Sequence, residues 1–300
     1  MKKISLLILV IIFAQIPSFS CDICGCGAGS YYLGFMPQLN RNLIGVRYRY
    51  MDFHTYGHRS WENTQEYFHI TEVWARIYPH KKWQVMGFLP YSFNRQQTYT
   101  GNKYLQGIND VLFLANYQLI NTLNDTISEK KHSLWLGGGV KLPTGKYQYN
   151  EMDTRVVANP NFQLGTGSTD FLVNLVYTLR KNKWGINTEA SYKINTSNSE
   201  NYRFGNRFMT TTSFFYLRQV KNIALMPHVG FYAEYSGMDS RNQTEVEHTG
   251  GGALATSVGV DVFFKNFTWA LHWQKPLMQN LGQGHIFAQN RLVVQMNVTF

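Results

Sequence analysis

The stretch Arg291–Phe300, RLVVQMNVTF, decides the fold class of this 300-residue chain. Its side chains alternate between apolar and polar up to a final aromatic residue. Because residues two apart in a strand share a face, the two faces differ in polarity. The apolar face carries Leu292, Val294, Met296, Val298 and Phe300, and the polar face carries Arg291, Gln295, Asn297 and Thr299. A soluble sandwich would bury the apolar face, whereas a bacterial outer-membrane barrel turns it to lipid.

The composition favours the barrel. Aromatic residues make up 15% of the chain, charged residues 15%, and there are 25 glycines, which suits short strands, aromatic girdles and tight turns. No stretch approaches 18 consecutive apolar residues, so membrane-spanning helices are excluded. The net charge of +10 favours anionic solutes or lipid headgroups. Nucleic acid is not an expected partner, since no lysine run exceeds two residues.

The first twenty residues have the pattern of a secretory signal. Lys2 and Lys3 precede the apolar run 4–14, and Ser18-Phe19-Ser20 fits a cleavage site. The expected organisation is a signal peptide at 1–20, a cysteine-rich periplasmic segment at 21–41, and an outer-membrane barrel at 42–300. The localisation that follows is the bacterial outer membrane.

All three cysteines, Cys21, Cys24 and Cys26, lie within six residues. Three thiolates on a glycine-containing loop suit copper or zinc. A disulfide between two of them, or lipidation of Cys21 as the first mature residue, is the simpler explanation. The barrel itself requires no cofactor, and the choice between metal, disulfide and lipid stays open.

Twelve segments of alternating polarity are expected to form strands, with boundaries uncertain by about two to four residues. They are 42–53, 66–78, 82–93, 107–121, 132–142, 168–180, 183–195, 206–219, 223–236, 254–264, 267–275 and 287–300. The connections between them alternate in length. This rhythm predicts an all-β fold, a transmembrane antiparallel barrel of about 12 strands with short periplasmic turns and longer extracellular loops.

The same alternation predicts which side chains face the lumen. The expected lumen residues are Arg47, Arg49, Glu72, Arg76, Asp110, Asp170, Glu189, Lys193, His228, Glu234, Asp261 and His272. They carry both charge signs, and Arg47, Arg49, Glu72 and Arg76 fit an interior ladder of salt bridges. Phe300 is expected on the lipid face, where it serves membrane assembly.

Three short motifs resemble those of a known family. They are Gly107-Ile108-Asn109-Asp110, Leu142-Pro143-Thr144-Gly145-Lys146, and the segment 164–171, LGTGSTDF. With about 107–300 of the chain, they resemble the outer-membrane barrels of the meta-pathway phenol degradation family, often labelled transporters. The opening 21–27 resembles that of a Bacteroidetes-type subset with a cysteine-rich mature N-terminus. The resemblance implies a channel or transporter and fixes no substrate.

The motif residues also have simple structural explanations. Asp110 and Asp170 fit a turn into the barrel rim, where they cap or pair, and Lys146 fits a solvated loop charge. No Gly-x-Ser-x-Gly or His-Glu-x-x-His arrangement occurs, so we do not expect an enzyme. The expected function is an outer-membrane channel for small solutes, with outer-membrane lipid, the barrel-assembly machinery and the solute as partners. The alternative is a barrel whose cysteine segment binds or helps move a soft metal such as copper.

Overall fold

The computed structural model describes residues 41–56, 63–122, 129–148 and 162–300. Nearly all of the regular structure is antiparallel strand. The strands are β1 (Leu43–Thr55), β2 (Thr64–His80), β3 (Trp83–Thr98), β4 (Gly101–Ile108), β5 (Val111–Asn121), β6 (Lys130–Leu142), β7 (Asp170–Lys181), β8 (Trp184–Ile194), β9 (Tyr202–Arg203), β10 (Arg207–Tyr216), β11 (Arg218–Val220), β12 (Ile223–Ser236), β13 (Ser240–Arg241), β14 (Thr244–Glu245), β15 (Gly251–Phe264), β16 (Phe267–Leu281) and β17 (Ile286–Thr299). A short 3-10 turn, η3 (Gly282–Gly284), joins the last two strands.

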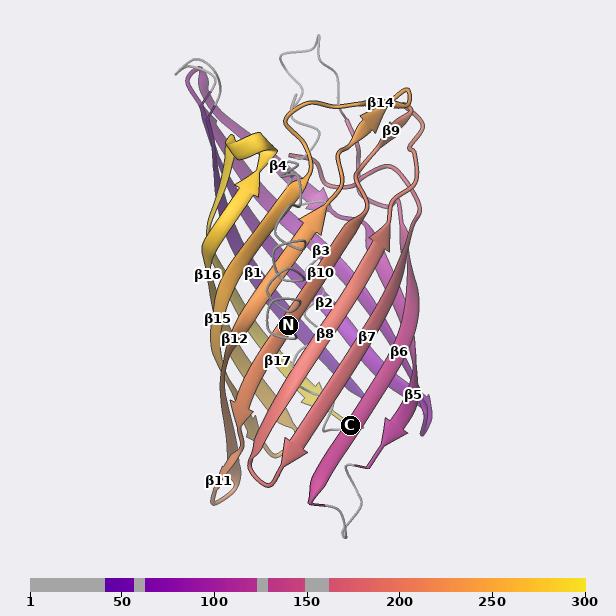
Figure 1. Cartoon of the computed structure of the whole chain (residues 1–300), viewed down its shortest axis with the longest axis vertical. Coiled ribbons are helices and arrows are strands. Elements are labelled where there is room, and N and C mark those ends of the chain that lie inside the picture. The colour runs from indigo at the N-terminus through magenta and orange to yellow at the C-terminus, as the bar shows by residue number, and fades with distance from the viewer. Residues whose placement is uncertain (1–40, 57–62, 123–128, 149–161) are drawn as a thin grey trace, which may run out of the picture.

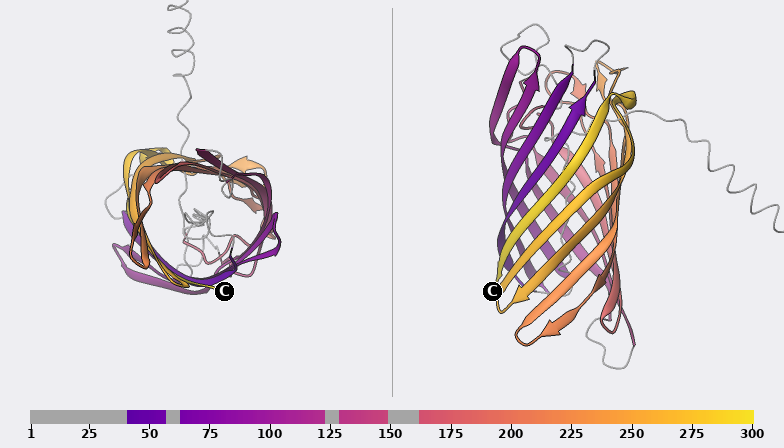
Figure 2. Two further views of the ribbon diagram at one scale, coloured as in Figure 1. Left: turned by 90° about the horizontal axis from the view of Figure 1, so that it is seen from below. Right: turned by 90° about the vertical axis from the view of Figure 1, so that its left-hand side faces the viewer.

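These strands close into a barrel, as the view along its axis shows (Figures 1 and 2). Strand β1 pairs with both β2 and β17, and β10 pairs with both β8 and β12, so the main sheet has no open edge. Strands β4 and β5 both pair with β3, and β10 and β11 both pair with β12. Each of these pairs therefore forms one barrel strand, which gives twelve barrel strands and confirms the predicted fold class.

Two predicted strands are interrupted in the structure. The segment 206–219 divides into β10 and β11 at Leu217. The segment 107–121 was expected to be a single strand, but β4 ends at Ile108 and β5 begins at Val111. The residues between them, Asn109 and Asp110, leave the ladder, and both are buried. The register shifts by one residue at the break, because Tyr91 pairs with Ile108 but Phe88 pairs with Leu112. The outward positions are therefore even-numbered in β4, as in Ile108, and odd-numbered in β5, as in Phe113.

The two ends of the barrel differ in their connections. At one end, here called the turn end, two-residue turns join β7 to β8, β11 to β12 and β15 to β16. Their first residues, Asn182, Lys221 and Lys265, have φ of 55°, 52° and 52°, the left-handed backbone that such hairpins use. The other end, the loop end, carries the longer connections and a small sheet formed by β9, β13 and β14. The connection around Thr100, expected to be long, is an exception, because β3 and β4 extend toward each other and only Tyr99 and Thr100 join them. In outer-membrane barrels the short turns are periplasmic.

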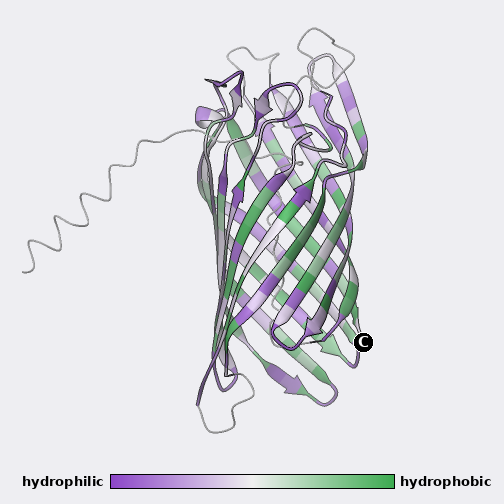
Figure 3. Cartoon of the chain, turned by 90° about the vertical axis from the view of Figure 1, so that its right-hand side faces the viewer, coloured by the Kyte–Doolittle hydropathy of each residue, from purple (hydrophilic) through white to green (hydrophobic). Residues whose placement is uncertain are grey.

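The outer surface is apolar. Outward side chains of one strand after another are large and exposed, as in Phe113, Val173 and Leu271, and Figure 3 shows the resulting alternation along the strands. Near the turn end, aromatic rings pair across strands, with Trp83 and Tyr117 centroids 5.1 Å apart. An apolar surface of this extent requires lipid rather than water. Among the described residues, no helix is long and apolar enough to cross a membrane.

Candidate functional site

The inward faces of the strands form a polar lumen wall. All twelve predicted lumen residues are buried, from Glu72 at 0% exposure to Glu189 at 7%. They do not form one continuous ladder. The structure groups them into separate clusters at different heights, and three of these clusters contain buried ion pairs.

The first cluster lies where β1 meets β2. Arg47 and Glu72 are direct partners in the register, and Arg47 Nε donates to Glu72 Oε1 at 2.9 Å. Arg49 Nη2 contacts the second carboxylate oxygen at 3.3 Å. Arg47 also lies over the rings of Trp74 and Phe88. Glu72 thus neutralises two arginines in the interior, where an uncompensated charge is costly.

Arg76, which the sequence places in the same ladder, has a different surrounding. Its guanidinium lies over the Tyr78 ring, with Cζ 5.6 Å from the ring centroid. Arg76 is fully inside the wall at 2% exposure. The structure places Arg47, Arg49, Glu72 and Arg76 at buried positions of β1 and β2, and the carboxylate of Glu72 contacts the two arginines of β1.

A second ion pair joins strands that are not neighbours. Arg291 of β17 donates to Glu234 of β12 at 2.7 Å, although β16 and β15 lie between them in the sheet. Tyr232 Oη donates to the other oxygen of Glu234 at 2.8 Å. The pair reaches across the inside of the wall, which the curvature of the sheet permits.

The third group, here called the loop-end cluster, consists of Asp110, Lys141, Asp170 and Lys193. Lys141 Nζ lies 2.5 Å from Asp110 Oδ2 and 2.8 Å from Asp170 Oδ2. Lys193 Nζ lies 3.3 Å from the same Asp170 oxygen. The cluster brings together the β4–β5 break and the loop-end residues of β6, β7 and β8. Two ammonium groups and two carboxylates balance in charge.

The loop-end cluster also holds the three sequence motifs together. Asp110 Oδ1 accepts from the Gly145 backbone N–H at 3.0 Å, and Asp110 Oδ2 accepts from the Thr166 N–H at 2.9 Å. A Cβ on Gly145 would lie 2.6 Å from the Leu164 carbonyl oxygen, so glycine permits this close approach. Asp110 thus holds the three motifs together through Gly145 and Thr166, and we call this arrangement the clasp. Lys146 lies outside it and is exposed.

Beyond the clasp, the loops have a buried carboxylate of their own. Asp239 accepts from Tyr202 Oη and from the Gly205 N–H, both at 2.7 Å. Burial raises the pKa of the Asp239 carboxyl above its ordinary value, although both hydrogen bonds act to lower it. These contacts fix β9 and the start of β13 against the barrel rim.

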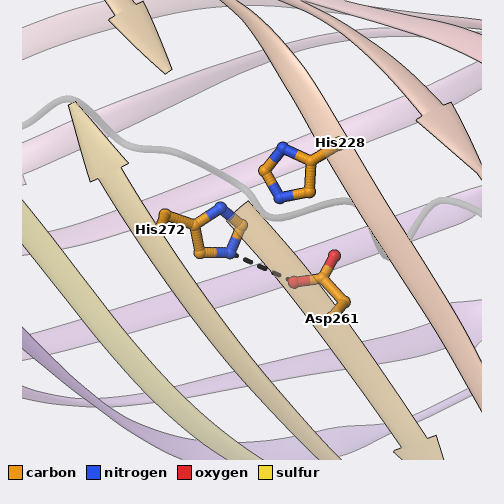
Figure 4. Close-up of side chains that lie close together, drawn as sticks. All are labelled: His228, Asp261 and His272. Carbon is orange, nitrogen blue, oxygen red and sulfur yellow. Dashed lines mark ion pairs between the residues drawn. The ribbon is translucent and has the colours of Figure 1, made fainter. Parts of the chain in front are cut away.

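One further group has the donor set of a metal centre. His228, Asp261 and His272 project into the lumen from β12, β15 and β16 (Figure 4). His272 Nε2 lies 3.1 Å from Asp261 Oδ1, and the two imidazole centroids are 4.6 Å apart. Alternation along the strands placed each of the three inward, but their meeting depends on the register of β12, β15 and β16.

Sequence reasoning did not single out two residues that matter here, Lys141 and Gly259. The alternation of β6 does place Lys141 inward, directly before the Leu142-Pro143 motif, so a signal was present. The role of Gly259 follows only from the register. Cys21, Cys24 and Cys26 lie outside the described residues. Their metal, disulfide and lipid interpretations stay predictions, as does the division of the chain at 20 and 41.

Comparison with known proteins identified one matching family and several solved structures with a similar fold. The family model described as "Putative MetA-pathway of phenol degradation" matches residues 56–279. An outer membrane channel from Pseudomonas putida F1 is similar with a TM-score of 0.62 and 15% identity, over 87% of this chain and 95% of that chain. The β-domain of the Bordetella autotransporter BrkA has a TM-score of 0.55 and 12% identity, over 87% and 100%. At these identities the likeness concerns the fold. No curated protein matches the sequence.

Proposed function

This chain belongs to the family described as "Putative MetA-pathway of phenol degradation", whose model matches residues 56–279. We propose that it is an outer-membrane channel for small solutes. The observation that carries the proposal is the closed barrel with an apolar outside and a polar inside. Such a wall separates lipid from a hydrated path. The similar Pseudomonas putida protein is itself described as an outer membrane channel. The proposal includes no catalytic step.

The lumen wall supports a preference among solutes. Between the ion pairs it carries an apolar patch that extends to the loop-end cluster, where Leu112 pairs with Lys141 and Leu172 pairs with Lys193 in the register. The patch consists of Trp74, Met86, Phe88, Leu112, Leu114, Trp135, Leu172 and Val176. The Trp74 and Phe88 rings stack with an interplanar angle of 3°. An apolar patch beside buried arginines favours solutes that combine an aromatic or apolar part with a polar group.

Conductance and solute uptake test the channel directly. The refolded full chain should produce discrete current steps in a planar bilayer. Liposomes containing it should swell faster with a small aromatic alcohol than with a sugar of similar size. Trp135→Ala should reduce that difference, while Trp184→Ala, on the outer face and 66% exposed, should leave it unchanged. Absence of both current and swelling from correctly folded protein contradicts the channel.

The alternative function concerns the cysteine segment. We also infer membership of the subset with a cysteine-rich mature N-terminus and copper binding at Cys21, Cys24 and Cys26. The support is their spacing in the sequence. A thiol count by mass spectrometry separates the three states, since a disulfide leaves one thiol, lipidation of Cys21 leaves two, and a reduced metal site has three. Copper uptake by a triple Cys→Ser variant as tight as that of the parent protein would end this alternative.

Insertion of the barrel into the outer membrane requires lipid and assembly partners. We propose that the chain interacts with outer-membrane lipid through its outward apolar residues and with the barrel-assembly machinery during folding. The support is the exposed apolar outer surface, which cannot remain in water while the chain crosses the periplasm.

A further inference from the structure

Two histidines and an aspartate meet on the lumen wall, outside the ion pairs and the clasp. His228, Asp261 and His272 are 4%, 2% and 4% exposed. Their strands are adjacent in the order β12, β15, β16, and the three side chains point toward one another (Figure 4). One ligand atom from each residue lies within 4.8 Å of the other two. We call this group the lumen triad.

Gly259 makes the meeting possible. In the register it pairs with His228 on one side and with His272 on the other. A Cβ at Gly259 would lie 2.5 Å from His228 Nε2 and 2.7 Å from the Leu271 carbonyl oxygen. Any other residue would therefore separate the two imidazoles. The wall has a glycine at the one position that lets two rings from alternate strands approach to 4.6 Å.

Asp261 is the second observation that points to a ligand. Among the described residues, neither of its carboxylate oxygens accepts a hydrogen bond, and its polar contact there is His272 Nε2 at 3.1 Å. A buried carboxylate is costly unless a positive group compensates it. A neutral imidazole offers the carboxylate at most one N–H and no positive charge to compensate it. A cation between the three donors would supply the positive charge that Asp261 lacks.

Nearby arginines do not supply that cation. Arg49, Arg291 and His272 line the same hollow of the wall. Arg49 contacts Glu72, however, and Arg291 contacts Glu234. Asp261 is thus the carboxylate of this region that no arginine contacts among the described residues.

We propose that the lumen triad binds one divalent transition-metal ion of the Zn²⁺ type. Two imidazoles and one carboxylate suit such ions, and three protein ligands leave a position open for water or a solute group. With metal bonds of about 2.0–2.2 Å, neighbouring ligand atoms lie about 3.3 Å apart. The His272–Asp261 contact of 3.1 Å is close to this separation. The ligand atom of His228 lies within 4.8 Å of the other two, so metal binding requires its side chain to move toward them. The site is distinct from the channel function and does not depend on it.

Its place in the barrel gives it access from the periplasm. Asp261 lies three residues from Phe264, where the β15–β16 turn begins, and His272 lies five residues after Phe267. At about 3.3 Å per residue, the triad is about 10–17 Å from the turn end. An ion bound there stands in the solute path rather than at the surface.

Titration of the detergent-folded full chain tests the site. Cys21, Cys24 and Cys26 are first changed to Ser, so that thiolates do not compete. Calorimetry with Zn²⁺ should give one equivalent, and Co²⁺ should give the visible absorption of a low-coordinate site. Asp261→Asn, His228→Ala and His272→Ala should each weaken Zn²⁺ binding at least about tenfold.

Two variants act as controls. His69 lies on the outer face, where Tyr48 contacts it, so His69→Ala should leave Zn²⁺ affinity unchanged. At the loop end, His248 and His285 form another pair with centroids 4.6 Å apart. Uptake that disappears in His248→Ala but persists in Asp261→Asn would assign the ion to that pair and overturn the proposal.

Gly259→Ala provides a test that keeps all three ligands. Its new methyl group occupies the space of His228, so Zn²⁺ affinity should fall although no donor is lost. Heat-modifiable migration confirms folding of each variant. If a variant fails to fold, the test rests on the folded protein that keeps the triad. If that protein shows neither Co²⁺ absorption nor heat of Zn²⁺ binding, the proposed site is wrong. If the protein conducts current but binds no metal, only the metal site is refuted. If it binds metal but conducts no current, only the channel function is refuted.

Discussion

Glu72 is the residue of the first cluster that contacts both arginines, Arg47 and Arg49. It contacts Arg47 and Arg49 with both oxygens, and its side chain is 1% exposed. Removing the carboxylate leaves two guanidinium groups facing each other in a buried wall. Buried ion pairs contribute little net stability when intact, but loss of one partner is severe because the other charge remains desolvated.

We therefore expect Glu72→Gln to lower the free energy of unfolding by about 3–5 kcal/mol. Urea unfolding followed by tryptophan fluorescence measures the change. The matched control is Glu129→Gln, since Glu129 and Lys181 form an ion pair at 3.2 Å with side chains 79% and 55% exposed. That change should cost no more than about 1 kcal/mol. Equal effects of the two substitutions would show that the Glu72 pair is not desolvated.

At the scale of elements, Lys141 connects the β4–β5 break to the loop-end residues of β6 and β7. Lys141 Nζ contacts both carboxylates of the loop-end cluster and donates to the Ser168 carbonyl oxygen at 3.0 Å. The strands themselves are held by their ladders. The cluster instead holds the described ends of the β6–β7 connection, at Gly145 on one side and at Thr166 and Ser168 on the other.

Lys141→Met should thus leave the barrel intact and loosen the connection. We expect cleavage by proteinase K between Leu142 and Asp170 to become at least about tenfold faster, which corresponds to about 1.4 kcal/mol of local stability. Lys146→Met is the control, because Lys146 is exposed and outside the cluster. If both variants are cleaved at the parent rate, the clasp has no role in ordering the loop.

Strand β17 closes the barrel against β1, and Phe300 follows it on the outer face with 70% exposure. Phe300→Lys places a charge at the lipid interface, where the energetic cost is at most about 1 kcal/mol in a folded barrel. We expect the folded variant to be nearly as stable as the parent but to insert less efficiently into membranes in cells. Fractionation of outer membranes measures this. Full insertion would remove the assembly role assigned to Phe300.

The whole molecule is stabilised by closure. Every barrel strand has two neighbours, so unfolding cannot begin at a sheet edge. We expect unheated protein to migrate differently from boiled protein in detergent gels, with circular dichroism dominated by sheet. Identical migration, together with release from membranes by salt alone, would contradict a membrane barrel.

Alternation of polarity, together with the alternating lengths of the connections, predicted the approximate strand positions, the two faces and the antiparallel barrel, because a period of two requires one apolar and one polar side. It placed Asp110, Asp170, Glu234 and His272 inward one by one. Their partners were decided by the tertiary structure. Arg291 meets Glu234 across two strands, and His228 meets His272 over Gly259, because register and curvature set these distances. Sequence periodicity contains neither quantity, since it describes each strand separately.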